Sequence, residues 1–133
     1  MHNELIQVLF LAALSDGQLH EEEKQLIAQY TKFYPIFKNV SSDDIKDQLK
    51  ILSTKINSGI PAKYIITEIK NKLNQEELKT AYALAVELCC ANFKLVPPEN
   101  DFIGMLEEVW EINKTNQDIV KKSAYLRYAT KFN

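Results

Sequence analysis

Hydrophobic residues recur every three or four positions along most of the chain, the spacing that places them on one face of an α-helix. Proline, glycine and short polar clusters separate these periodic stretches. The pattern therefore predicts an all-α fold, a single compact bundle of about seven helices. The expected helices cover about residues 3–14, 20–34, 42–58, 61–73, 75–91, 97–110 and 117–130.

Several local signals predict where these helices begin and end. Ser41, followed by acidic residues, is typical of a helix start, because its hydroxyl accepts from the first free amides and the acids favour the positive end of the helix dipole. Asn74 with Glu77 three residues later predicts a reciprocal cap on the fifth helix. Gly59 is expected to end the third helix, and Pro97 to open the sixth.

The apolar stripes predict the core. The first helix is apolar at nearly all of its later positions, which indicates a central, buried element. Phe33, Ile56 and Ile119 fall on the stripes of the second, third and seventh helices. Cys89 and Cys90 point about 100° apart on a helix, so one can lie in the core while the other is partly exposed. We expect reduced thiols with a packing role, rather than a redox or soft-metal role.

The composition fits one soluble globular domain over residues 1–133, with 46% hydrophobic and 26% charged residues. A formal net charge of −2 lacks the basic footprint of a nucleic-acid-binding protein. The longest uninterrupted apolar run, residues 8–14, is far shorter than the ~20 residues of a transmembrane helix. The N-terminal residues carry Glu4 and no lysine or arginine, unlike a secretory signal, so we expect a cytoplasmic protein.

An internal repeat appears when the sequence is shifted by 76 residues. Residues 13–19 then align with residues 89–95, and the helices that follow stay in register. The match predicts two related helix-turn-helix hairpins. Ala28 aligns with Gly104, and we expect these small residues to let a neighbouring helix approach closely. The two hairpins cover about residues 3–34 and 75–113.

The turn of the first hairpin is the candidate metal site. Asp16 and Glu23 match acidic positions of an EF-hand loop, but Ala12 and Leu14 stand where that loop needs further oxygen ligands, which argues against a true EF-hand. A weaker divalent-metal site is the alternative to an EF-hand, because several acidic residues lie close together at the start of the second helix. His20 lies next to these acids and could be a further ligand. The expected donors of this metal site are Asp16, Glu21, Glu22 and Glu23.

A purely structural interpretation explains the same residues without an ion. Asp16 can fold onto nearby backbone amides, Gly17 can adopt a positive φ, and Leu19 can anchor the turn to the core. The second turn is expected to be stabilised by the residues that align with those of the first turn. Its backbone is expected to have a different shape, because Phe93 stands where the first turn has Gly17. The aligned residues are Asn92, Leu95 and Glu99.

Catalytic chemistry finds little support in the sequence, which holds no phosphate-binding glycine loop, no nucleophile elbow and no zinc-protease motif. Cys89 or Cys90 with His20 is the only conceivable nucleophile and base, and a cysteine in a buried helix is a poor nucleophile. We therefore expect a protein that is not an enzyme. Charge is uneven towards the C-terminus, with acids dominating residues 99–111 and bases dominating residues 114–131. Either the two helices compensate each other, or the basic segment docks an acidic partner.

Residues 11–24 resemble the hallmark of the tellurite-resistance TerB-like family, in which a buried helix is followed by Asp-Gly, an apolar residue and acids opening the next helix. The domain is also similar to the N-terminal part of a membrane-anchored DnaJ-type co-chaperone. The resemblance implies a non-enzymatic bacterial stress-response protein that acts through protein partners and a metal ion. The alternative function is that of a metal-independent scaffold or a co-chaperone-like protein-binding domain. The sequence is also compatible with a homodimer.

Overall fold

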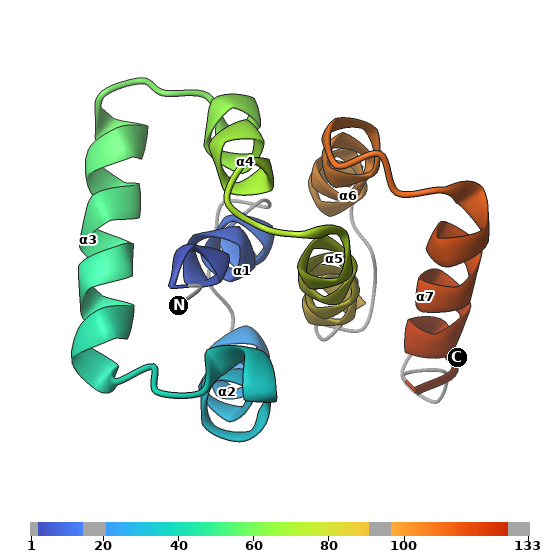
Figure 1. The fold of residues 1–133 in the computed structure, drawn as a ribbon, viewed down its shortest axis with the longest axis horizontal. Coiled ribbons are helices and arrows are strands. Elements are labelled where there is room, and N and C mark those ends of the chain that lie inside the picture. Colours follow the sequence, from blue (N-terminus) through green and yellow to red (C-terminus); the bar gives the residue numbers. More distant parts are fainter. Residues whose placement is uncertain (1–2, 15–20, 91–96, 128–133) are drawn as a thin grey trace.

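The computed structural model describes residues 3–14, 21–90 and 97–127, apart from the side chains of Glu22 and of residues 97–100. The described residues form seven α-helices and one short 3-10 helix, without a strand (Figure 1). The all-α expectation is thus confirmed. The elements are α1 (Glu4–Leu14), α2 (Glu21–Phe33), η1 (Pro35–Phe37), α3 (Ser42–Asn57), α4 (Ala62–Lys70), α5 (Gln75–Cys90), α6 (Pro97–Val109) and α7 (Lys114–Arg127).

The helices α1 and α5 form the centre of the bundle. They pack against each other, with α3 and α4 beside α1 and with α6 and α7 beside α5 (Figure 1). Every residue of α1 from Leu5 to Ala13 is buried, as its apolar composition predicts. Among the described helices, none has both the length and the hydropathy that a membrane span requires.

The predicted helix caps are present. The Ser41 side chain accepts from the Asp44 amide at 3.1 Å, and the Asp44 carboxylate accepts from the Ser41 amide at 2.9 Å. Asn74 and Glu77 exchange the same pair of bonds at the start of α5, at 2.8 and 2.9 Å. Gly59 adopts a φ of +82° just after α3, a conformation that glycine takes without strain. These residues mark the start and the end of α3 and the start of α5.

Some predicted boundaries are wrong by a few residues. The last helix begins at Lys114, earlier than the expected residue 117, because the Asn113 side chain accepts from the Asn116 amide and caps it. The helix α4 ends at Lys70 rather than at the expected residue 73. Leu73 continues the apolar spacing of α4 in the sequence, but it is buried from the turn that follows the helix. Side-chain burial in a turn therefore mimics one more helical turn in the sequence.

Several predicted core residues lie at the surface. Phe33 is 70% exposed and Ile119 is 61% exposed, although both follow the helical spacing of their stripes. Ala28 and Gly104 are exposed as well, and a Cβ built on Gly104 would meet no atom within 4 Å. The expected close helix approach at these small residues is therefore wrong. Periodicity locates an apolar face but does not show how much of that face a neighbour covers.

Both cysteines are fully buried, so neither takes the partly exposed position that the helical geometry allows. The reason is the central place of α5, which packs against α1, α2, α6 and α7 and has little free surface at its C-terminal end. Burial of a thiol favours a packing role and disfavours nucleophilic reactivity.

Candidate functional site

The described acids of the predicted metal site do not share a face. Glu21 is exposed and its carboxylate lies 4.0 Å from the Lys24 ammonium, whereas Glu23 is 0% exposed. Residues two positions apart on a helix point about 200° away from each other, which accounts for the difference. The structure therefore directs one expected donor to solvent and the other into the interior.

The remaining residues of the predicted site fall outside the described part of the chain. They are Asp16, Gly17, Leu19 and His20 of the first turn, with the Glu22 side chain. Asn92, Leu95 and the Glu99 side chain of the second turn lie outside it as well. Within the residues that are described, no three His, Cys, Asp or Glu side chains lie close enough to hold a metal ion. The complete donor set stays a prediction.

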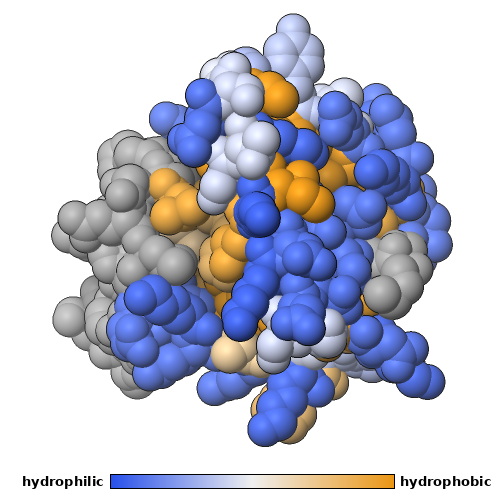
Figure 2. Space-filling model, turned by 90° about the vertical axis from the view of Figure 1, so that its left-hand side faces the viewer, coloured by the Kyte–Doolittle hydropathy of each residue, from blue (hydrophilic) through white to orange (hydrophobic). Residues whose placement is uncertain are grey.

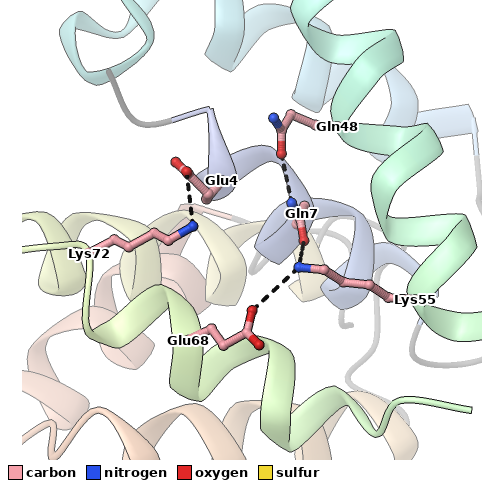
Figure 3. Close-up of polar contacts among 6 residues, drawn as sticks. All are labelled: Glu4, Gln7, Gln48, Lys55, Glu68 and Lys72. Atoms are coloured by element: carbon pink, nitrogen blue, oxygen red, sulfur yellow. Dashed lines mark hydrogen bonds and ion pairs between the residues drawn. The ribbon is translucent and has the colours of Figure 1, made fainter.

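A polar cluster joins α1, α3 and α4 on the side away from α7 (Figure 3). Gln7 is only 3% exposed, and its amide nitrogen donates to the Gln48 side-chain oxygen at 2.7 Å. The Lys55 ammonium donates to the Gln7 oxygen at 3.4 Å and lies 3.6 Å from the Glu68 carboxylate. A buried amide with both ends bonded fixes how α3 sits on α1, because any other register would leave a polar group unpaired.

A shallow groove runs along α5 between Tyr34 and α7. Its floor is made by α5 side chains at positions 80, 83, 84 and 87, and one wall is made by α7. The volume of the groove is about 480 Å³. We call it the α5 groove, and it is lined by Tyr34, Thr80, Ala83, Leu84, Glu87, Ile119, Val120, Ser123 and Arg127.

The charges of the α5 groove compensate each other. Arg127 lies 3.3 Å from the Glu87 carboxylate and donates to the Ser123 hydroxyl at 2.6 Å. These two ionisable side chains are opposite in sign, so the described lining carries no net charge. The polar end of the groove is thus occupied by its own ion pair, and the rest of the lining is apolar or uncharged.

A second ion pair holds α7 against α5 and α6. The Glu107 carboxylate accepts from the Tyr82 hydroxyl at 2.6 Å and lies 2.7 Å from the Lys121 ammonium. Burial, reinforced by the hydrogen bond to Glu107, raises the pKa of Tyr82 well above its usual value, and burial also raises the pKa of Tyr125. The acidic α6 and the basic α7 therefore neutralise each other at this point. This agrees with the interpretation that the two helices compensate each other's charge, rather than with docking of an acidic partner.

The groove was not predicted from the sequence. Its clearest signal is the presence of Ile119 and Val120 side by side in α7, since a helix that buries one narrow stripe leaves one of two adjacent apolar residues exposed. The polar cluster of α1, α3 and α4 has a separate signal in the sequence: Gln7 is a polar residue that interrupts the apolar run of the first helix. In comparisons with known proteins, no protein-family model, no curated protein and no solved structure matches the chain.

Proposed function

We propose that this chain is a non-catalytic, TerB-like protein-binding module of a bacterial stress-response system, which accepts an amphipathic helix of a partner protein in the α5 groove. The binding requires no metal ion. The observation that carries the proposal is the strip of α5 left uncovered between Tyr34 and α7. The stress-response context comes from the resemblance of residues 11–24 to the TerB-like family.

A helix suits this groove by shape. The floor positions 80, 83, 84 and 87 follow the spacing of one helix face over about two turns. Thr80 and Ala83 are small, so a second helix can lie close to the α5 backbone. The groove volume of about 480 Å³ accommodates several aliphatic side chains of such a helix.

Burial of exposed apolar surface supplies the driving force. Ile119 and Tyr34 are partly exposed on opposite walls, and a docked helix would cover both of them. Each 100 Å² of apolar surface removed from water contributes about 2.5 kcal/mol before the costs of association. Because the groove carries no net charge, its partner presents an apolar face with uncharged flanks, rather than an acidic face.

The non-catalytic and metal-independent parts of the proposal rest on burial. Cys89 and Cys90 are fully buried, and burial makes a thiol a poor nucleophile. Glu21 and Glu23 point in different directions, so these two acids do not chelate one ion together in this conformation.

The test uses the full chain labelled at isoleucine methyl groups and titrated with a synthetic helical peptide. The peptide carries leucines at helical spacing on one face and glutamine and serine elsewhere. We expect the Ile119 methyl resonance to shift, with the same shift in the presence of a chelator. Ile51, exposed on α3 at the opposite edge of the bundle, should stay unmoved (Figure 1).

Two outcomes would refute the proposal. Shifts that vanish when EDTA is added would show that binding needs a metal ion. An unmoved Ile119 methyl at about 1 mM peptide would leave the groove without helix-binding activity. The stress-response part is tested separately, by survival on tellurite of bacteria that lack the gene and of the same bacteria complemented with it.

A further inference from the structure

A second apolar pocket lies on another side of the molecule, where α1, α3, α4 and α6 meet. Its volume is about 380 Å³. Leu14 ends α1, Ile56 belongs to the last turn of α3, and Met105 projects from α6. The pocket shares no described lining residue with the α5 groove. It is lined chiefly by Leu14, Ile56, Ala62, Asp101, Phe102 and Met105.

The apolar rim of this pocket is in contact with solvent. Leu14 is 36% exposed and Ile56 is 45% exposed, although both are large aliphatic side chains. Ile60, in the connection between α3 and α4, is exposed too. In Figure 2, which faces α3, apolar side chains reach the surface beside the hydrophilic side chains that dominate this view. Apolar surface gathered around a hollow is typical of an interaction site.

One carboxylate marks the edge of the pocket. Asp101 is the only ionisable side chain in the described lining, and it is exposed. The outer face of α6 continues from Asp101 through Gly104 to Glu108, at helical spacing, and α6 contains no lysine or arginine. Gly104 leaves this face flat, with open space where a side chain would stand. No described cation forms an ion pair with Asp101, so its carboxylate is free to pair with an incoming group.

We infer that this pocket takes a large apolar side chain from a partner segment that carries lysine or arginine beside it. The apolar side chain fills the space above Phe102 and Met105, and the basic group pairs with Asp101. The acidic face of α6 attracts such a segment and repels an acidic one. This surface is independent of the α5 groove, and it would let the chain hold two partners at once.

The experiment compares two synthetic helical peptides of about 15 residues. Both carry leucines on one face; the first has lysines beside the leucines, and in the second every lysine is replaced by glutamate. Methyl resonances of Met105 and Ile56 report the pocket, and that of Ile119 reports the α5 groove. We expect the lysine peptide to shift Met105 and Ile56, with an affinity at least about tenfold higher than that of the glutamate peptide.

A matched pair of variants isolates the contribution of the carboxylate. Asp101→Lys and Asp47→Lys change the net charge equally, and both residues are exposed, but Asp47 lies in the N-terminal half of α3 outside the pocket lining. Asp101→Lys should weaken binding of the lysine peptide by about fivefold, and Asp47→Lys by less than about twofold.

Three results would overturn the inference. Equal binding of the two peptides would show that the pocket does not select charge. Shifts confined to Ile119 would place the peptide in the α5 groove alone, which leaves the proposed function intact. Shifts of Met105 that grow with protein concentration, without peptide, would identify a second copy of the chain as the occupant.

Discussion

Single polar side chains determine how the helices of this protein are positioned. Gln7 lies in the most apolar helix and is buried, yet both ends of its amide are bonded to α3 side chains (Figure 3). Glu107 acts similarly between Tyr82 and Lys121. Leaving a buried polar atom unpaired costs about 1–3 kcal/mol, so each of these contacts disfavours alternative helix placements.

Removal of the buried amide is expected to destabilise the fold. Gln7→Ala should lower the free energy of unfolding by about 1–3 kcal/mol, because Gln48 and Lys55 lose their shared partner and a small cavity remains. Urea unfolding followed by circular dichroism measures the change. Gln29→Ala is the control, an exposed glutamine on α2 whose removal should change stability by less than about 0.5 kcal/mol. Equal effects of the two substitutions would contradict a structural role for the cluster.

The predicted metal donors are tested one residue at a time. Because Glu21 is exposed and Glu23 is buried, we expect calcium, manganese and zinc to leave the backbone amides around Asp16 and Glu21 unmoved in an NMR titration. Site-specific shifts of these amides that disappear in Asp16→Asn would instead establish a metal site in this turn.

The capped starts of α3 and α5 were predictable from the sequence, because their signals are local. Ser41 and Asn74 satisfy free amides within their own turn, so the sequence is enough to predict their role. The exposure of Phe33 and Ile119 depends on which helices lie beside them, and the sequence holds no local signal of that. The α5 groove escaped prediction for the same reason, since it is formed by Tyr34 and two helices far apart in the chain.

The cap of α3 should make a measurable contribution. Ser41→Ala removes the acceptor of the Asp44 amide and should cost about 1 kcal/mol of unfolding free energy. Ser53→Ala, an exposed serine within the same helix, is the matched control and should be neutral or slightly stabilising, because alanine favours the helix interior. The same loss of stability in both variants would argue against the cap.

The contact between α5 and α6 predicts a loss of stability in alkali. The pKa of Tyr82 is raised in the folded chain, so folding favours the protonated phenol. The contribution of this phenol to the free energy of unfolding is complete below about pH 10, because a tyrosine in the unfolded chain ionises near that pH. Stability should therefore fall as the pH rises above about 10. In Tyr82→Phe the fall should be shallower, as measured by thermal unfolding across the pH range. An unchanged slope would show that Tyr82 does not titrate differently in the two states.

On the scale of the whole molecule, the two central helices leave different surfaces on different sides of the bundle. The α5 groove carries no net charge, and its apolar walls suit a neutral amphipathic helix. The pocket beside α6 has an apolar rim with one carboxylate, Asp101, at its edge, and it suits an apolar side chain with a basic neighbour. The net charge of −2 conceals this difference, because Lys121 and Arg127 are paired with Glu107 and Glu87 within the fold. An arrangement of this kind fits a module that brings partner proteins together.

The most direct measurement of the central claim is the affinity of a neutral amphipathic helical peptide for two charge-matched variants, determined in EDTA. Ile119→Glu places a charge on the wall of the α5 groove, and Ile51→Glu places the same charge on α3, where the isoleucine is also exposed. The account predicts that Ile119→Glu weakens binding by at least about tenfold, whereas Ile51→Glu leaves it within about twofold of the unmodified chain. Equal affinities of the two variants would contradict the assignment of the α5 groove as the binding site.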